Sequence, residues 1–210
     1  MLGLNHKTAP VEVRERFSIT KQAVRSGLAN LNEYEGLSEA VVLSTCNRSE
    51  IYAVVDDEGK DLPVLKQFLF DLTGNEEDID EYLYHFASEE CIRHLFQVAS
   101  SLDSLVLGEG QILSQVKDAY ALGREEGTTS TVLNTLFHRA IATGKRVRTE
   151  TRIQYNSVSV SYAAVELARE ELGDLCQSNA LIFGAGKMAE LTAQHLLNTL
   201  EPQLAAVSNR

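Results

Sequence analysis

The sequence lacks long apolar runs, a signal-like start and clustered cysteines. No apolar run approaches the roughly 18 residues that a membrane-spanning helix needs. The first residues, Met1–Lys7, show no signal-peptide pattern. Cys46, Cys91 and Cys176 are far apart and have no metal-ligand spacing, which argues against a zinc site. We therefore expect a cytoplasmic protein with free thiols and no bound metal.

Positive charge is also scarce. The chain has 19 Lys and Arg residues against 30 Asp and Glu residues, a formal net charge of -11. A general nucleic-acid binder needs a net positive surface to displace the counterions of phosphates, so this class is disfavoured, whereas a local basic patch is not. A chain of 210 residues, 44% hydrophobic and 23% charged, is typical of a soluble globular protein with one large or two ordinary domains.

Hydrophobic patterning predicts a mixed first part of the chain. Leu2 and Leu4 indicate a short first strand, and Pro10 can start a short helix. The elements predicted next are a helix over 20–32, strands over 39–45 and 50–55, a helix that opens at Pro63, and an edge strand at 83–85. This order is the ferredoxin-like split arrangement of strands and helices.

The rest of the chain is mostly helical up to Gly173. The helices predicted here cover 88–101, 111–125, 130–150 and 157–172. Some of them can merge into one long helix that acts as a spacer. The elements predicted after Gly173 are a strand over 179–183, a helix over 187–200 and a strand over 204–208. The fold class is therefore α/β, with an α+β first domain and the start of a Rossmann-type domain at the end.

The most informative segment joins the two central strands. An apolar strand that ends in Ser-Thr-Cys-Asn-Arg presents the thiol of Cys46 at a surface pocket. A thiolate is a nucleophile, and a cation such as Arg48 either lowers the pKa of a nearby thiol or holds a substrate carboxylate. The pair favours covalent chemistry on an acidic acyl substrate. A buried structural cysteine beside a surface arginine is the alternative, and it is the commoner case for a lone cysteine.

A glycine-rich turn follows the predicted strand over 179–183. Its residues are Gly184, Ala185, Gly186, Lys187, Met188 and Ala189. The first glycine allows a tight turn, the second allows a pyrophosphate to approach, and alanine takes the place of a third glycine. Between a predicted strand and helix, this string indicates a dinucleotide site. After the second strand the chain has Arg210 and no acid, which favours NADP(H) over NAD.

A Rossmann half needs more than these two strands, so we expect the sequence to be the front portion of a longer protein. Five strings then match one family in order and spacing. They are GLNHKTAP at 3–10, LSTCNRSEIY at 43–52, SLDSLVLGE at 101–109, QILSQVK at 111–117 and KRVRTET at 145–151. On these strings the chain resembles glutamyl-tRNA reductase over essentially its full length.

The resemblance implies an activity and a division of the chain. The activity is the NADPH-dependent reduction of the glutamyl group of glutamyl-tRNA to glutamate-1-semialdehyde, the first step of 5-aminolevulinate and tetrapyrrole (porphyrin, haem) biosynthesis. Residues 1–150 would form the catalytic domain that recognises glutamyl-tRNA, 151–172 a spinal linker helix and 173–210 the start of the NADP-binding domain. The family's C-terminal dimerisation domain has no counterpart here. We expect the full-length protein to be a homodimer that hands its aldehyde to glutamate-1-semialdehyde aminomutase.

The same resemblance implies the roles of the site residues. Cys46 would attack the ester carbonyl that joins glutamate to the tRNA, and hydride from NADPH would reduce the resulting thioester. Arg48 would hold the glutamyl carboxylate. His94 would assist proton transfers, the alternative being a helix histidine packed at a domain seam. The other substrate-binding residues are Thr45, Asn47, Ser104, Glu109, Gly110, Gln111 and Gln115. Gly110 stands where many members of the family have proline.

A basic stripe is the candidate contact for the tRNA backbone. Lys145, Arg148 and Arg152 lie at i, i+3 and i+7 on one helical face, with Arg139 and Arg146 nearby. Intrahelical ion pairs with neighbouring acids explain these residues equally well.

Three other functions stay open. Without a reductase domain, the 1–150 region can act as a thiol esterase on glutamyl-tRNA, with water in place of hydride. A non-catalytic tRNA-binding module is a second alternative, although such a module does not require the Cys46 thiol. An unrelated Rossmann dehydrogenase is a third, and it leaves the first 150 residues unexplained.

Overall fold

The computed structural model describes residues 1–151, 153 and 160–208. By its internal contacts the chain divides into two units, Met1–Asn156 and Ser157–Arg210. Each unit has its own packing.

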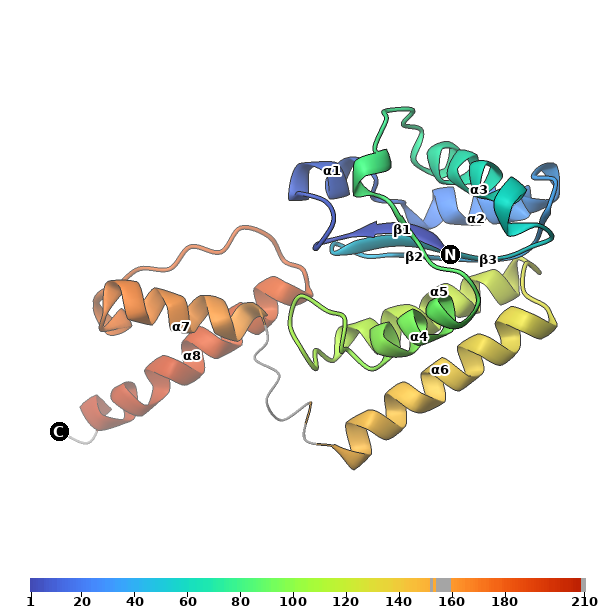
Figure 1. The fold of residues 1–210 in the computed structure, drawn as a ribbon. Helices are drawn as coiled ribbons and strands as arrows, with labels where there is room; N and C mark the ends of the chain where they lie inside the picture. The colour runs from blue at the N-terminus through green and yellow to red at the C-terminus, as the bar shows by residue number, and fades with distance from the viewer. Residues whose placement is uncertain (152, 154–159, 209–210) are drawn as a thin grey trace. The chain divides into compact units, whose positions relative to one another are not determined.

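Four antiparallel strands form the sheet of the first unit (Figure 1). They are β1 (Leu2–Asn5), β2 (Leu37–Ser44), β3 (Arg48–Val55) and β4 (Tyr84–His85), in the spatial order β2-β3-β1-β4. Because β1 and β2 are each antiparallel to β3, they run in the same direction with β3 between them. This is the split arrangement that the sequence predicts.

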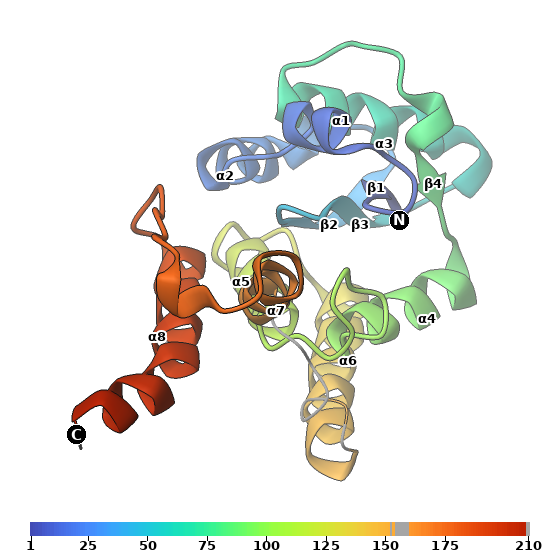
Figure 2. The same cartoon turned by 90° about the vertical axis from the view of Figure 1, so that its left-hand side faces the viewer.

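Helices cover both faces of this sheet (Figures 1 and 2). One face carries α1 (Val11–Arg16), α2 (Lys21–Ala29) and α3 (Glu58–Thr73). The other face carries α4 (Ser88–Ala99), α5 (Gln111–Glu125) and α6 (Thr131–Glu150). Short 3-10 turns occupy Leu31–Glu33 and Asp80–Tyr82. The helices predicted from periodicity are confirmed to within a few residues at their ends.

One helix of this unit begins earlier than predicted. α3 starts at Glu58, ahead of Pro63. The Asp57 side chain accepts a hydrogen bond from the Gly59 amide, and this cap sets the start of the helix. Pro63 then lies inside the helix, where it removes one backbone donor without ending the helix.

The sheet separates two hydrophobic cores. Neighbouring residues of a strand point to opposite faces, so Val42 of β2 packs in the core under α2 and α3, whereas Val41 packs in the core under α4, α5 and α6. Ile51 and Tyr52 of β3 divide in the same way. Because both faces are covered, residues 40–43 of β2 and 51–55 of β3 are continuous apolar runs without alternation.

A carboxylate from the edge strand β2 holds the start of α6. The N-cap residue of α6, Ser130, makes no side-chain capping bond. The buried Glu39 carboxylate instead accepts hydrogen bonds from the amides of Ser130, Val132 and Leu133 at 2.8, 3.1 and 2.8 Å. A negative charge at a helix N-terminus also interacts favourably with the helix dipole. Glu39 therefore fixes α6 to the sheet across a long sequence separation.

The second unit differs from the prediction. It contains α7 (Val160–Leu172), a 3-10 turn at Leu175–Gln177 and α8 (Lys187–Ser208). The segment 179–183, predicted as a strand, has no regular structure, and Leu181 and Phe183 are 78% and 89% exposed. The segment 204–208, predicted as the second strand, is the last part of α8.

Both differences have one physical cause. A strand is stable only when a neighbouring strand satisfies its backbone donors and acceptors, and the described residues of this unit contain no such neighbour. The segment 204–208 begins Leu-Ala-Ala, and these good helix formers extend α8 instead. The predicted spacer is also interrupted, because Thr151 after α6 is extended (φ −126°). Residues 154–159, where helices would have to merge, lie outside the described residues.

None of the helices in the described part of the chain has both the length and the apolarity to cross a membrane.

Replacing Glu39 with alanine should lower the free energy of unfolding by about 2 kcal/mol, because three amides at the start of α6 lose their acceptor. Urea unfolding followed by far-UV circular dichroism measures this change. Glu35→Ala is the matched control, because Glu35 is an exposed acid of the same segment, and it should stay near the wild-type value. Equal midpoints for the two variants would contradict the capping role.

Candidate functional site

The loop between β2 and β3 carries an exposed thiol. Thr45 organises the loop, because its hydroxyl oxygen accepts hydrogen bonds from the amides of Asn47 and Arg48, each at 3.1 Å. The Thr45 amide in turn donates to the Arg48 carbonyl oxygen at 2.8 Å. Cys46 stands at the tip of this tight turn with its side chain exposed. The turn thus displays the thiol while the amides of Thr45, Asn47 and Arg48 are hydrogen-bonded within it.

Arg14 of α1 ties this loop to the helix layer. Its guanidinium donates through Nη1 to the Cys46 carbonyl oxygen at 2.9 Å and to Asn47 Oδ1 at 3.1 Å. Nε of the same side chain donates to the Ala9 carbonyl oxygen at 3.2 Å. Arg14 therefore restrains the backbone on which the thiol is mounted.

A small cavity opens beside Cys46. It is lined by Thr45, Cys46, Asn47, Arg48, Ser104, Leu105, Glu109, Gln111, Ile112 and Gln115. These residues come from the β2–β3 loop, from the loop over 101–110 and from the start of α5. Eight of the ten substrate-site and catalytic residues expected from the sequence therefore meet at one cavity.

The other two of these ten residues do not line the cavity. Gly110 is the N-cap residue of α5, and a Cβ built on it would lie 3.7 Å from Arg148 Nη2. His94 lies on α4 and is 7% exposed. Neither residue lines the cavity, so each acts on it only through neighbours.

Arg48 is buried and already paired. Its Nη1 donates to Glu50 Oε1 at 2.6 Å, and its Nη2 donates to the Asp103 carbonyl oxygen and lies 3.4 Å from Asp103 Oδ2. The side chain is only 1% exposed. An incoming substrate carboxylate therefore meets a guanidinium that is locked between two acidic residues.

Glu50 is the centre of this arrangement. Its carboxylate accepts hydrogen bonds from Arg48, from Tyr84 at 2.5 Å, from Tyr52 at 2.7 Å and from His94 Nε2 at 2.9 Å. A carboxylate can only accept, so His94 carries its proton on Nε2. Burial alone would raise the pKa of Glu50, but the hydrogen bond from His94 and the charge of Arg48 outweigh it and lower the pKa to about 2. Glu50 is therefore a charged, fully buried anchor.

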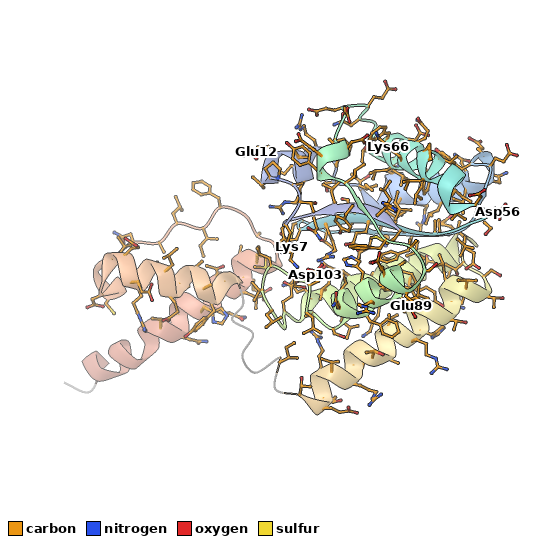
Figure 3. The ribbon with its side chains drawn as sticks, in the orientation of Figure 1. Lys7, Glu12, Asp56, Lys66, Glu89 and Asp103 are labelled. Atoms are coloured by element: carbon orange, nitrogen blue, oxygen red, sulfur yellow. The ribbon has the colours of Figure 1, made fainter. Side chains whose placement is uncertain are left out.

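Asp103 links the buried network to the surface. Lys7 forms an ion pair with it, and Figure 3 shows the two labelled side chains close together. Burial would raise the pKa of Asp103, but the hydrogen bond from Lys7 and the charge of Arg48 lower it. The second ring nitrogen of His94 lies 3.9 Å from Asp103 Oδ2. His94 is thus held between two carboxylates.

His6 lies in the same charged region. Burial and then the charge of Arg48 lower the pKa of His6, which favours the neutral ring. The sequence offered no role for His6 or Lys7, although both stand in the first of the matching strings. The structure gives Lys7 one, because it balances the charge of Asp103.

Sequence reasoning missed Glu50, Asp103, Arg14 and Lys7. A signal for Glu50 was available, because Arg48, Glu50 and Tyr52 alternate along β3 and so share one face. Arg14 and Asp103 carry no comparable signal, since they reach the site from distant segments.

The basic stripe on α6 does not form as predicted. Arg148 turns inward and donates through Nη2 to the Glu109 carbonyl oxygen at 2.5 Å. Arg146 pairs with Glu150 one turn along the helix, the alternative that the sequence left open. Arg152 lies outside the described residues. Lys145 and Arg139 remain exposed.

The glycine turn of the second unit stands directly before α8. Gly184 has φ +111°, a conformation that glycine adopts readily. Nothing lies within 4 Å of a Cβ built on Gly184 or Gly186. Ala185 completes the turn, and Lys187, Met188 and Ala189 form the first turn of α8. Arg210 lies outside the described residues.

The chain is similar to proteins named glutamyl-tRNA reductase. A family model described as "Glutamyl-tRNAGlu reductase, N-terminal domain" matches residues 2–151, and one described as "Shikimate / quinate 5-dehydrogenase" matches residues 166–210. The chain is 50% identical over 199 residues to glutamyl-tRNA reductase of Desulforudis audaxviator, covering 94% of this chain and 44% of that protein. It is 49% identical over 200 residues to the enzyme of Pelobacter propionicus, covering 95% and 46%.

A solved structure agrees with these matches. Glutamyl-tRNA reductase from Methanopyrus kandleri superposes with a TM-score of 0.65 at 36% identity, covering 94% of this chain and 46% of that chain. The chain thus spans less than half the length of the relatives that it matches. Since the family model covers most of its residues, the chain belongs to the glutamyl-tRNA reductase family.

Proposed function

We propose that this chain binds glutamyl-tRNA and forms a glutamyl thioester on Cys46, as part of an NADPH-dependent glutamyl-tRNA reductase. The product would be glutamate-1-semialdehyde, the entry to 5-aminolevulinate and tetrapyrroles. The observation that carries the proposal is the exposed Cys46 thiol on the wall of a polar cavity that seven other expected residues also line. The names of the relatives support the choice of substrate.

The first chemical step needs only this cavity. The sulfur of Cys46 attacks the ester carbonyl carbon and gives up its proton as the C–S bond forms. The ester C–O bond then breaks, and the tRNA leaves through its terminal ribose oxygen, which takes up a proton. Arg14 and Thr45 hold the loop so that the thiol faces the cavity. Asn47 and Gln115 provide polar contacts for the glutamyl group.

Arg48 is the proposed attraction for the glutamyl side chain. Its positive charge favours a carboxylate over the neutral amide of glutamine. Because Glu50 holds one side of the guanidinium, the substrate carboxylate would approach the side where Asp103 Oδ2 lies 3.4 Å from Nη2. His94 acts here as a positioning residue, since it holds Glu50 and faces Asp103.

The residues before α8 fit one part of NADPH. An open glycine turn at a helix N-terminus suits a pyrophosphate, which Gly184, Ala185 and Gly186 would hold through backbone amides. The described residues of this unit form no strand beside the turn, so the rest of the cofactor has no partner among them. When bound, NADPH supplies the hydride that turns a thioester into an aldehyde. The homodimer, the cytoplasmic location and transfer to the aminomutase belong to the same proposal.

Cys46→Ser should abolish a covalent glutamyl adduct that the wild-type chain forms with glutamyl-tRNA, because the hydroxyl is a much weaker nucleophile. Intact-protein mass spectrometry after an acid quench detects the adduct. Cys176→Ser is the matched control, since Cys176 is also an exposed cysteine, and it should keep the adduct. No wild-type adduct with intact charged tRNA would sink the proposal, whereas released free glutamate would indicate the esterase alternative.

Glu50→Gln should lower the free energy of unfolding by roughly 3–5 kcal/mol near neutral pH, because the buried Arg48 loses the nearer of its two acidic partners. The folded pKa of Glu50, about 2, lies below its ordinary value of 4.5. Its stabilisation is therefore present above pH 4.5 and is lost as the pH falls towards 2.

The difference in the free energy of unfolding between wild type and Glu50→Gln should consequently become smaller in acid. Urea unfolding at several pH values measures this difference. The exposed Glu12→Gln is the control and should show little gap at any pH. A gap that stays constant down to pH 2 would refute a charged Glu50 in the folded state.

A further inference from the structure

The proposed thioester step needs a proton donor for the departing ribose oxygen, and no residue has so far been assigned to this role. After the thiol attacks the ester, the tetrahedral intermediate can expel either the thiolate or the ribose oxygen. A thiolate is the better leaving group, because thiols are far more acidic than alcohols. The intermediate therefore returns to the ester unless the ribose oxygen receives a proton as its bond breaks. A proton donor must lie in the cavity.

His94 is poorly placed for this task. It does not line the cavity, its Nε2–H is committed to Glu50 and its other ring nitrogen faces Asp103. A proton from this ring would pass first to a carboxylate of the buried network.

The cavity wall itself contains few titratable groups. Of the lining residues, only Cys46, Arg48 and Glu109 have one. Cys46 is the nucleophile, and Arg48 stays charged and paired. Glu109 is therefore the only carboxyl group among the residues that line this cavity.

We propose that Glu109 is the general acid that protonates the ribose oxygen of the leaving tRNA. In this step the C–S bond to Cys46 stays formed, the ester C–O bond breaks, its electron pair goes to the ribose oxygen, and the proton of Glu109 moves to that oxygen. The products are the glutamyl thioester, the free 3′-terminal hydroxyl and the Glu109 carboxylate. This role rests on the proposed function and adds a catalytic residue to it.

Hydrogen bonds fix the backbone of Glu109, and its half-buried side chain lines the cavity. Its carbonyl oxygen accepts hydrogen bonds from Ser101 Oγ at 2.7 Å and from Arg148 Nη2 at 2.5 Å. Its amide donates to the Val106 carbonyl oxygen at 3.2 Å. These bonds place the residue at the end of the 101–110 loop, directly before α5. A proton donor on an anchored backbone meets the geometric demand of general acid catalysis.

The surroundings of the side chain support the protonated form. Burial raises the pKa of Glu109, and this effect exceeds the opposing ones of the nearby Ser104 side chain and of the charges of Arg48 and Arg148. These groups come from the loop, from β3 and from α6.

The test compares two esters that differ in leaving group. With glutamyl-tRNA, Glu109→Gln should slow single-turnover formation of the Cys46 adduct by about 10²–10³-fold. With the 4-nitrophenyl α-ester of glutamate, whose leaving group needs no proton, the variant should stay within roughly threefold of wild type. Glu109→Asp, which keeps an acid, should recover part of the rate with glutamyl-tRNA. Asp118→Asn, an exposed acid-to-amide change on α5, should leave both rates unchanged.

Each outcome decides a separate point. An equal loss on both esters, or no loss on either, overturns the acid role of Glu109 and leaves the thioester proposal standing. A wild-type chain that forms no adduct with either ester overturns the proposed function and this role with it. Misfolding of Glu109→Gln would also appear as loss on both esters, but it would change the far-UV circular dichroism spectrum as well. In that case Glu109→Asp, which keeps an acid, carries the test: an equal loss on both esters by a folded Glu109→Asp overturns the role.

Discussion

A carboxylate without access to water, Glu50, holds the site together. Four donors from three segments converge on it, and each would be left unsatisfied in the protein interior if the carboxylate were removed. Arg48, at 1% exposure, has Glu50 as the nearer of its two acidic partners, the other being Asp103. His94 and Tyr84 are fixed by the same group, so α4 and β4 are tied to β3 through a single side chain. Folding and site geometry therefore depend on one buried anion.

Around Glu50, the charged side chains are buried, whereas the reactive groups are exposed or half-buried. Arg48, Glu50 and Asp103 are buried, whereas the Cys46 thiol is exposed. The buried groups are mutually compensated, which limits the cost of removing them from water. The exposed thiol and the half-buried Glu109 remain available to a substrate. The buried charges thus set the electrostatic potential of the cavity, and the thiol and Glu109 are the groups that a substrate can reach.

Much of the first unit could be predicted, because its elements depend on local patterns. Apolar runs at helical or strand spacing lie where α2, β2, β3 and α5 form, and the Cys46 loop stands where the apolar strand ends. The partners of Arg48 could not be read in this way. Asp103 contacts Arg48 from 55 residues away, and His94 contacts Glu50, the other partner of Arg48, from 44 residues away. Sequence periodicity does not indicate such contacts.

The two strand predictions for the second unit were wrong, because a strand does not depend on local pattern alone. The strings at 179–183 and 204–208 have strand-like composition, but strands form only in pairs, and composition does not supply a neighbour. The glycine turn and the helix after it were predicted correctly, because a helix satisfies its own backbone. Most site residues of the first unit lie on or beside two loops, the one between β2 and β3 and the one before α5. The elements that flank these loops were also predicted from local patterns, so the position of the site could be predicted.

One hydrogen bond of Glu109 connects the cavity wall to the end of α6. Arg148, which holds the Glu109 carbonyl, lies two residues from the end of α6, and Gly108 approaches the backbone of Ile153 so closely that a Cβ there would meet its carbonyl oxygen at 2.3 Å. The chain leaving α6 is thus mechanically coupled to the cavity wall. A change that moved the backbone at Ile153 would therefore also displace the loop that carries Glu109.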